Sequence, residues 1–220
     1  QTLPFELTDG QKKVVNEICF DLRAPYEMNR LLQGDVGSGK TIVATIAMVA
    51  TALTGKQAAL MVPTEILAEQ HMLTIEKLIQ GTPFKAVLLT GSMNRSQKKR
   101  KELLAQIESG EANLIIGTHA LFQQDVTFKD LAFVVIDEQH RFGVQQRQAL
   151  AGKGAGVNVL QMTATPIPRT LAITAFGEMD TSILGEIPRG RQPIKTTWVR
   201  EQEMEQIFDF VERQIQKGRQ

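Results

Sequence analysis

The stretch Gly34-Asp35-Val36-Gly37-Ser38-Gly39-Lys40-Thr41 (GDVGSGKT) decides the fold class of this 220-residue chain. It matches the pattern G-x-x-x-x-G-K-S/T and lies between a short apolar run, 30–33, and an apolar segment of helical period, 40–53. In that context glycines let backbone N–H groups fold around phosphate oxygens, while Lys40 reaches the terminal phosphates and Thr41 ligates Mg²⁺. The loop is therefore predicted to bind a nucleoside triphosphate through Gly34, Asp35, Gly37, Ser38, Gly39, Lys40 and Thr41.

Short apolar runs and helical segments continue to alternate along the chain, which predicts an α/β fold with a mainly parallel sheet flanked by helices. Strands are expected at 30–33, 58–62, 86–89, 113–116, 133–136 and 157–162, and helices at 40–53, 66–79, 97–108 and 167–176. Parallel α/β sheets bind ligands beyond the carboxyl ends of their strands, so functional residues are expected directly after each strand.

Two adjacent acids, Asp137 and Glu138, follow the strand expected at 133–136 in the stretch VVIDEQHRFG. In this fold, that strand can lie beside the strand that leads into the phosphate loop. Asp137 would then hold Mg²⁺, and Glu138 would orient and deprotonate a water for attack on the γ phosphate. An isolated acidic pair at a strand end is more often a solvated surface feature, but the phosphate loop upstream favours the catalytic interpretation.

The composition restricts the class of protein without identifying a partner. Hydrophobic residues make up 42% of the chain, which is enough for one complete core and part of another. Lys plus Arg number 25 and Asp plus Glu 24, so a nucleic-acid surface would have to be a local patch. The single cysteine, Cys19, is expected in a small core position, and the absence of long apolar runs favours a cytosolic location.

The pattern changes after Phe176, where three Gly and two Pro between 177 and 196 predict an extended linker. A short strand at 196–199 and an amphipathic helix at 201–217 are expected next, and this tail indicates the start of a second α/β domain. We therefore expect a first domain at 1–185, a linker at 186–195 and the beginning of a second domain at 196–220. One face of the expected helix carries Met204, Ile207, Phe208, Val211 and Ile215.

Five motifs together resemble those of the superfamily 2 helicases: GDVGSGKT, PTEILAEQH, GTHALFQ, DEQHRFGVQQR and MTATPIPRT. The resemblance covers residues 1 to about 195 and is strong to the bacterial DNA helicases that remodel branched DNA and stalled forks. Transcription-repair coupling translocases share most of these motifs but usually carry a third acid where this chain has Gln139. A non-catalytic, nucleotide-gated protein-binding module is the alternative from another functional class.

The resemblance implies a RecA-like first motor domain that binds ATP and Mg²⁺ in the bacterial cytoplasm. It also implies a second RecA-like lobe that supplies arginine fingers, and a branched or forked DNA partner. Gln11 matches the position of an adenine-reading Gln, although Thr8-x-x-Gln11 also fits a capping box at a helix start. His140, with Thr163 and Thr165, matches residues that couple the nucleotide site to the neighbouring lobe and to DNA.

The DNA contacts that the resemblance implies lie in loops after strands. They are Pro63 and Thr64, Thr90 and Gly91, and Gly117, Thr118 and His119. Hydroxyls and backbone N–H groups at helix starts suit sequence-independent contacts with phosphates, but Thr64 and Thr118 could equally be plain helix caps. The basic run 98–101 precedes Leu103, Leu104 and Ile107 at helical spacing, so a solvated helix face is favoured over a DNA contact.

Overall fold

The computed structural model describes residues 6–91, 97–137, 156–165, 179–185, 198–200, 202 and 204–218. The chain divides into two compact units, residues 1–188 and residues 189–220. The first unit contains the sheet and every candidate site residue. The second contains one described helix. The domain boundaries expected from the sequence remain a prediction.

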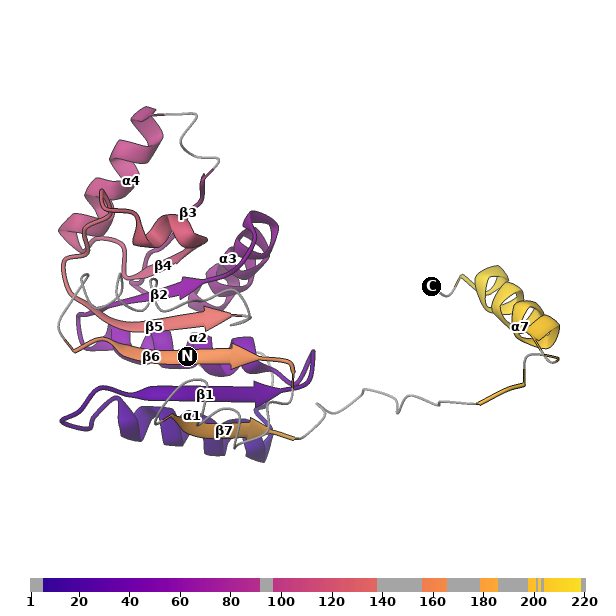
Figure 1. Cartoon of the computed structure of the whole chain (residues 1–220). Helices are drawn as coiled ribbons and strands as arrows, with labels where there is room; N and C mark the ends of the chain where they lie inside the picture. Colours follow the sequence, from indigo (N-terminus) through magenta and orange to yellow (C-terminus); the bar gives the residue numbers. More distant parts are fainter. Residues whose placement is uncertain are drawn as a thin grey trace. The chain divides into compact units, whose positions relative to one another are not determined.

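The first unit is built on a seven-stranded sheet of order β3-β4-β2-β5-β6-β1-β7, in which each neighbouring pair is parallel. The strand arrows in Figure 1 accordingly run in one direction, so the carboxyl ends of the strands form one edge of the sheet. The strands are β1 (Asn29–Gly34), β2 (Gln57–Met61), β3 (Ala86–Leu89), β4 (Leu114–Gly117), β5 (Leu131–Asp137), β6 (Asn158–Thr163) and β7 (Asp180–Leu184).

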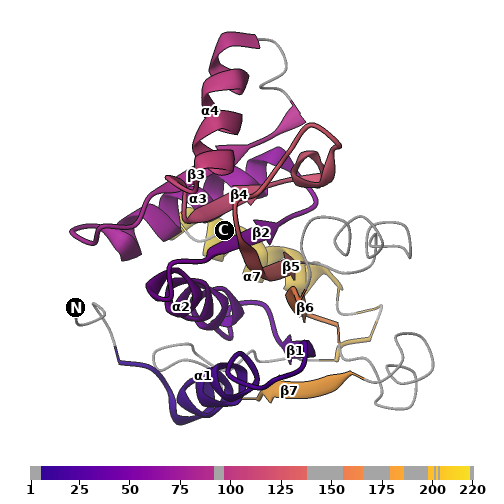
Figure 2. The ribbon, with the colours of Figure 1, turned by 90° about the vertical axis from the view of Figure 1, so that its left-hand side faces the viewer.

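Helices pack on both faces of the sheet. One face carries α1 (Asp9–Asp21), α2 (Lys40–Leu53) and α3 (Glu65–Ile79), and Figure 2 shows α1 and α2 side by side on it. The other face carries α4 (Gln97–Ser109) and the 3₁₀ helix η2 (His119–Phe122). Alternate strand side chains enter the two cores: Phe133 and Val135 face α1–α3, whereas Val134 and Ile136 lie on the α4 face.

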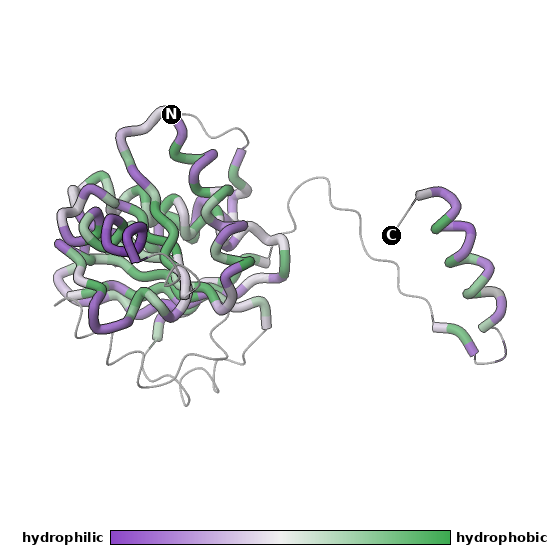
Figure 3. Tube along the Cα trace, turned by 90° about the horizontal axis from the view of Figure 1, so that it is seen from above, coloured by the Kyte–Doolittle hydropathy of each residue, from purple (hydrophilic) through white to green (hydrophobic). Residues whose placement is uncertain are grey.

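The hydropathy pattern follows from this arrangement. Strands buried on both faces need continuous apolar sequence, and β2, β4 and the centre of β5 are buried at every position. Figure 3 shows hydrophobic segments running through the interior of the first unit, with hydrophilic segments outside. The six strands expected from the sequence are confirmed to within two residues, as are the helices expected at 40–53, 66–79 and 97–108. The helix expected at 167–176 lies outside the described residues.

The acidic strand does not lie beside the strand that leads into the phosphate loop, although the sequence had allowed that position. β5, which ends at Asp137, pairs with β2 and β6, and β6 separates it from β1 and the phosphate loop. The register places Asp137 opposite Met162, and Thr163 opposite Gln33. Apolar runs reveal which segments are strands, but they carry no information about which buried strand occupies which slot.

A strand also forms where an extended linker was expected. β7 pairs in parallel with β1, from Arg30 opposite Asp180 to Gly34 opposite Leu184. Only Ser182 and Leu184 of this edge strand are buried, so its five residues have little apolar signal. The extended linker expected across 177–196 was wrong for 180–184, because pairing with β1, rather than local hydrophobicity, makes this segment a strand. The linker expected at 186–195 lies outside the described residues.

The second unit contains α7 (Met204–Gln216) close to the expected helix. Its side chains Met204, Phe208, Val211 and Ile215 are exposed along one stripe. Trp198–Arg200 has no regular structure, and the rest of the strand expected at 196–199 lies outside the described residues. Within the described part of the chain, no helix has the length and apolarity that a membrane span requires.

Candidate functional site

The phosphate loop joins β1 to α2 at the carboxyl edge of the sheet. α1 and α3 each begin at a threonine whose hydroxyl accepts a backbone N–H, Thr8 from Gln11 and Thr64 from Leu67. α2 begins instead at Gly39, with φ 91° and no side-chain cap. An L-residue is strained in this left-handed conformation, which glycine adopts freely. The uncapped start of α2 therefore suits an anionic ligand, as the sequence motif predicts.

Two side chains of the loop have the polarity that phosphate binding requires. Lys40 Nζ donates to the carbonyl oxygens of Gly34 at 2.6 Å and Asp35 at 3.1 Å, which holds the ammonium group against the loop. Ser38 is 3% exposed, and its Oγ has no hydrogen-bond partner. A buried hydroxyl without a partner is costly, so Ser38 is a further candidate ligand for a group in the loop.

Gln11 connects the first helix to this loop. Its Oε1 accepts the Thr8 N–H at 3.0 Å and its backbone N–H donates to Thr8 Oγ1 at 3.2 Å, so the capping box is confirmed. Its Nε2 donates to the carbonyl oxygen of Ser38 at 3.0 Å. Glu could make the cap but could not donate to this carbonyl, so the choice of Gln no longer needs an adenine to explain it. The adenine role remains a prediction.

Thr163 ends β6, the strand next to β1, and Asp137 ends β5, one strand further from the loop. Because β6 lies between β1 and β5, Asp137 stands two strand spacings, about 10 Å, from the strand that leads into the loop. Thr163 lies in the intervening position, and its Oγ1 is 2.9 Å from Thr165 Oγ1 and accepts the Thr165 N–H at 3.1 Å. Glu138 and His140 lie outside the described residues, so their roles remain predictions.

One residue of the site was missed by the sequence reasoning. His71 Nε2 on α3 lies 3.3 Å from Asp137 Oδ2, and both side chains are largely buried. His71 stands between the fully buried Ala68 and Ile75 at helical spacing, so its position on the sheet side of α3 was available as a signal.

The donor set fits magnesium. Asp137 and Thr41 offer carboxylate and hydroxyl oxygens, the hard ligands that Mg²⁺ prefers. Within the described ranges there is no group of three or more His, Cys, Asp or Glu residues that could enclose a metal ion. Mg²⁺ usually keeps several waters and takes substrate phosphates as ligands rather than entering an all-protein cage.

The loops expected to contact DNA lie at the same carboxyl edge, after the adjacent strands β2, β4 and β3. The two threonines that could be helix caps, Thr64 and Thr118, differ in their contacts. The Thr64 hydroxyl caps α3. Thr118 makes no side-chain cap at η2, and its buried Oγ1 has no hydrogen-bond partner. Pro63 precedes the cap, and the buried Thr90 is followed by Gly91. Their contacts with DNA remain predictions.

Gly117 permits the close packing of this region. A Cβ at Gly117 would stand 2.2 Å from the backbone oxygen of Leu89, so no side chain fits there. The backbone N–H of Thr118 donates to that same oxygen at 3.3 Å. The turn after β4 is thereby held against the end of β3, and His119 is exposed beyond it.

The side chains of the basic run 98–101 on α4 lie in two different environments. Lys98, Lys99 and Lys101 are exposed, as expected for a solvated helix face. Arg100 instead donates to Asp125 Oδ2 at 2.7 Å and Gln123 Oε1 at 2.9 Å, so it stabilises the segment after η2.

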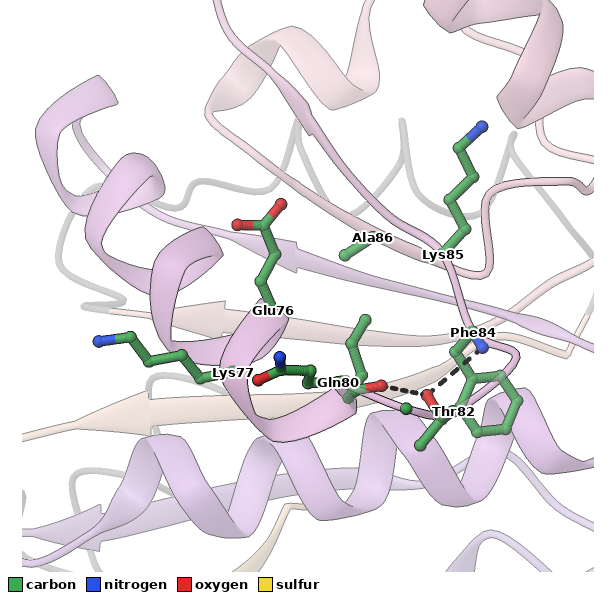
Figure 4. Close-up of a pocket in the computed structure, with 9 residues that line it drawn as sticks. Glu76, Lys77, Gln80, Thr82, Phe84, Lys85 and Ala86 are labelled. Atoms are coloured by element: carbon green, nitrogen blue, oxygen red, sulfur yellow. Dashed lines mark hydrogen bonds between the residues drawn. The ribbon is translucent and has the colours of Figure 1, made fainter.

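A surface pocket of about 520 Å³ lies elsewhere, between the end of α3 and the start of β3 (Figure 4). Thr82 organises its floor, where the hydroxyl donates to the Ile79 carbonyl at 2.5 Å and accepts the Phe84 N–H at 3.4 Å. Glu76, Lys77 and Lys85 extend around it. Because β3 runs from this pocket toward Thr90, the pocket lies at the amino edge of the sheet and is not part of the candidate site.

Similarity to known proteins indicates the same class of protein as the phosphate loop and the five motifs. Residues 8–173 match the family model described as DEAD/DEAH box helicase. The chain belongs to the DEAD/DEAH box helicase family. The resemblance to helicases that the sequence motifs indicate is thereby confirmed.

Among the DEAD/DEAH box helicases, this chain is similar to the ATP-dependent DNA helicases RecG. The chain is 58% identical over 219 residues to the ATP-dependent DNA helicase RecG of Staphylococcus epidermidis, and 54% identical over 220 residues to that of Bacillus subtilis. In both cases the whole chain is covered but only 32% of the relative's length. The chain therefore spans about a third of the relatives that it matches.

Solved helicase structures also resemble this chain. A structure of RecG bound to a three-way DNA junction matches with a TM-score of 0.86 at 40% identity, covering 98% of this chain and 29% of that one. The Hef helicase domain of Pyrococcus furiosus matches with a TM-score of 0.65 at 22% identity, which supports the fold alone. The RecA-like helicase fold expected from the sequence is confirmed.

Proposed function

We propose that this chain is the ATP-binding motor lobe of a DNA helicase that remodels branched DNA and stalled replication forks during recombination and repair. The observation that carries the proposal is the shared carboxyl edge of the sheet, on which the phosphate loop, Asp137 and Thr163 lie together with the expected DNA loops after β2, β4 and β3. Similarity to RecG over the whole chain supports a DNA substrate, and the relative bound to a three-way junction supports a branched one.

The proposed chemistry is ATP hydrolysis by in-line attack of water. Lys40 would neutralise charge on the β and γ phosphates, and the N–H groups at the start of α2 would orient them. Thr41 and Asp137 would hold Mg²⁺, which when bound supplies further charge neutralisation at the phosphates. Glu138 would orient the water and accept its proton.

Hydrolysis would require a second RecA-like lobe. The chain spans only 32% of its RecG relatives, which leaves room for such a lobe elsewhere in the protein. Arginine fingers from a neighbouring lobe typically contribute about 10³ to 10⁵ in rate. The isolated chain should therefore bind ATP and hydrolyse it poorly, and DNA-stimulated turnover at full helicase rates would contradict this proposal.

Movement along DNA would follow from closure of the two lobes around ATP. Contacts through Thr64, Thr90 and Thr118 to phosphates would be independent of sequence, as a translocating motor needs at every step. Thr163 and Thr165 stand between the loop strand and the Asp137 strand, a position that suits the proposed coupling with His140. The protein would act in the bacterial cytoplasm, where such substrates occur.

The decisive experiment is Glu138→Gln in the full-length protein. We expect ATP binding to be retained, with loss of ATP turnover and of fork unwinding. Persistent unwinding would reject Glu138 as the base. A protein-binding module gated by nucleotide would instead lack DNA-stimulated turnover in the unaltered protein as well.

A transcription-repair coupling translocase remains the alternative within the same family. Purified full-length protein should unwind a synthetic fork and leave a stalled RNA polymerase on its template. Release of the polymerase without fork unwinding would favour the coupling translocase. The high identity to RecG relatives favours the first outcome.

A further inference from the structure

α3 places a histidine against the carboxylate that is proposed to hold magnesium. His71 Nε2 and Asp137 Oδ2 are 3.3 Å apart, and the two side chains are 12% and 14% exposed. An ionised carboxylate can only accept, so the imidazole donates through its Nε2–H. The distance is at the long end for an N–H···O bond, which indicates orientation of the carboxylate rather than a strong ion pair.

The helix that carries His71 is packed firmly against the sheet on either side of this residue. Ala68 and Ile75, three residues before and four after it, are both fully buried against the sheet. Residues at these spacings share one face of a helix, so packing of α3 directs the Cα–Cβ bond of His71 toward the sheet. The start of the helix is also fixed, because Thr64 Oγ1 accepts the Leu67 N–H at 3.3 Å.

Strand β5 fixes the backbone of Asp137 but not the orientation of its carboxylate. Asp137 is the last residue of β5, and its neighbour across the pair is Met162 of β6. The paired backbone of β5 fixes its Cα, but the carboxyl group can rotate about its side-chain bonds. The strand fixes where the Asp137 side chain begins but not its rotamer. A hydrogen-bond donor on the facing helix α3 therefore selects one rotamer.

We propose that His71 is a positioning residue for Asp137, which orients the carboxylate for magnesium in the nucleotide complex. The inference rests on the proposed function, because it requires Asp137 to be a metal ligand. His71 would act on the metal through Asp137, because its Nε2–H donates to this carboxylate. Groups that hydrogen-bond a metal ligand commonly change metal affinity about 10- to 100-fold when removed.

The test compares two substitutions at one position in the full-length protein. His71→Leu removes the donor while keeping an apolar side chain of similar bulk. His71→Gln keeps an N–H donor at nearly the same distance from the backbone as Nε2. The measurement is equilibrium binding of a fluorescent, non-hydrolysable ATP analogue at increasing Mg²⁺ concentration, with a parallel titration of Mn²⁺ followed by electron paramagnetic resonance.

We expect His71→Leu to raise the Mg²⁺ concentration for half-maximal analogue binding about tenfold, with metal-free binding unchanged. His71→Gln should restore most of the loss, which a merely structural role would not predict. At saturating Mg²⁺ the KM for ATP should return toward its normal value. The matched control is Gln70→Leu, an exposed position on the same helix, which should titrate like the unaltered protein.

Normal Mg²⁺ dependence in His71→Leu would overturn the inference, as would a His71→Gln variant that is as defective as His71→Leu. If His71→Leu fails to fold, by circular dichroism, the comparison of His71→Gln with Gln70→Leu still decides it: a Mg²⁺ midpoint far above the control overturns the inference. Asp137→Asn separates this result from the proposed function. Unchanged metal dependence in Asp137→Asn would reject Asp137 as a ligand, whatever His71 does.

Discussion

Gln11 Nε2 donates a hydrogen bond to the carbonyl oxygen of Ser38 at 3.0 Å, so the first helix is attached directly to the phosphate loop. The bond joins residues 27 positions apart and is buried. The capping box fixes the same carboxamide from its other side, through the Thr8 N–H. The same Gln11 side chain therefore caps α1 and stabilises the conformation of the phosphate loop.

Replacement of Gln11 by Glu should distinguish support of the loop from recognition of adenine. Glu retains the cap but places a carboxylate oxygen against the Ser38 carbonyl, so nucleotide affinity should fall about tenfold through loss of one buried hydrogen bond. If Gln11 only supports the loop, ATP and GTP should weaken equally in fluorescence titrations. A larger loss for ATP than for GTP would establish the adenine role. Thr8→Ala is the control, because it removes the cap hydroxyl and leaves the Ser38 bond.

Replacement of Gly39 by Ala should disrupt the phosphate loop beyond simple backbone strain. The new Cβ would stand 2.1 Å from Gln11 Nε2, in addition to the left-handed φ of 91°. Gly55→Ala is the matched control, since its φ is 81° and nothing lies within 4 Å of the new Cβ. Each should lose about 1–2 kcal/mol of unfolding free energy from the backbone. Only Gly39→Ala should also lose nucleotide binding, and equal binding by both variants would contradict this account.

The two threonines should respond oppositely to the same isosteric change. Thr64→Val removes the acceptor that caps α3 and should cost about 1 kcal/mol in denaturant unfolding. Thr118→Val removes a buried hydroxyl that has no partner, so stability should hold or rise. If that hydroxyl contacts a DNA phosphate, affinity for forked DNA should fall in Thr118→Val. A stable variant with normal DNA affinity would remove Thr118 from the proposed interface.

Arg30 should be a strong determinant of stability at the other end of β1. It donates to Asp21 Oδ2 at 2.7 Å and Ser182 Oγ at 2.9 Å, and its side chain is 10% exposed. Arg30→Met would leave the carboxylate of Asp21 buried without its partner, at a cost of about 3–5 kcal/mol in urea unfolding. Lys12→Met, in an exposed pair with Asp9, should cost at most ~1 kcal/mol. A similar effect of both variants would show that the Arg30 network contributes little.

The sequence by itself determined the local features of this protein. GDVGSGKT required a strand before it and a helix after it, and continuous apolar runs identified six of the seven strands, because burial on both faces of a parallel sheet demands them. The capping box at Thr8 and Gln11 was equally legible, since it depends on residues three positions apart. Such signals involve neighbours along the chain.

Only the tertiary structure decided which of these features meet. The insertion of β6 between β1 and β5, the strand β7 and the contact between His71 and Asp137 depend on partners far apart in sequence. One buried apolar strand resembles another, so periodicity cannot order the sheet. Hydrophobic pattern determines that a segment is buried, whereas packing of all the segments together determines what it is buried against.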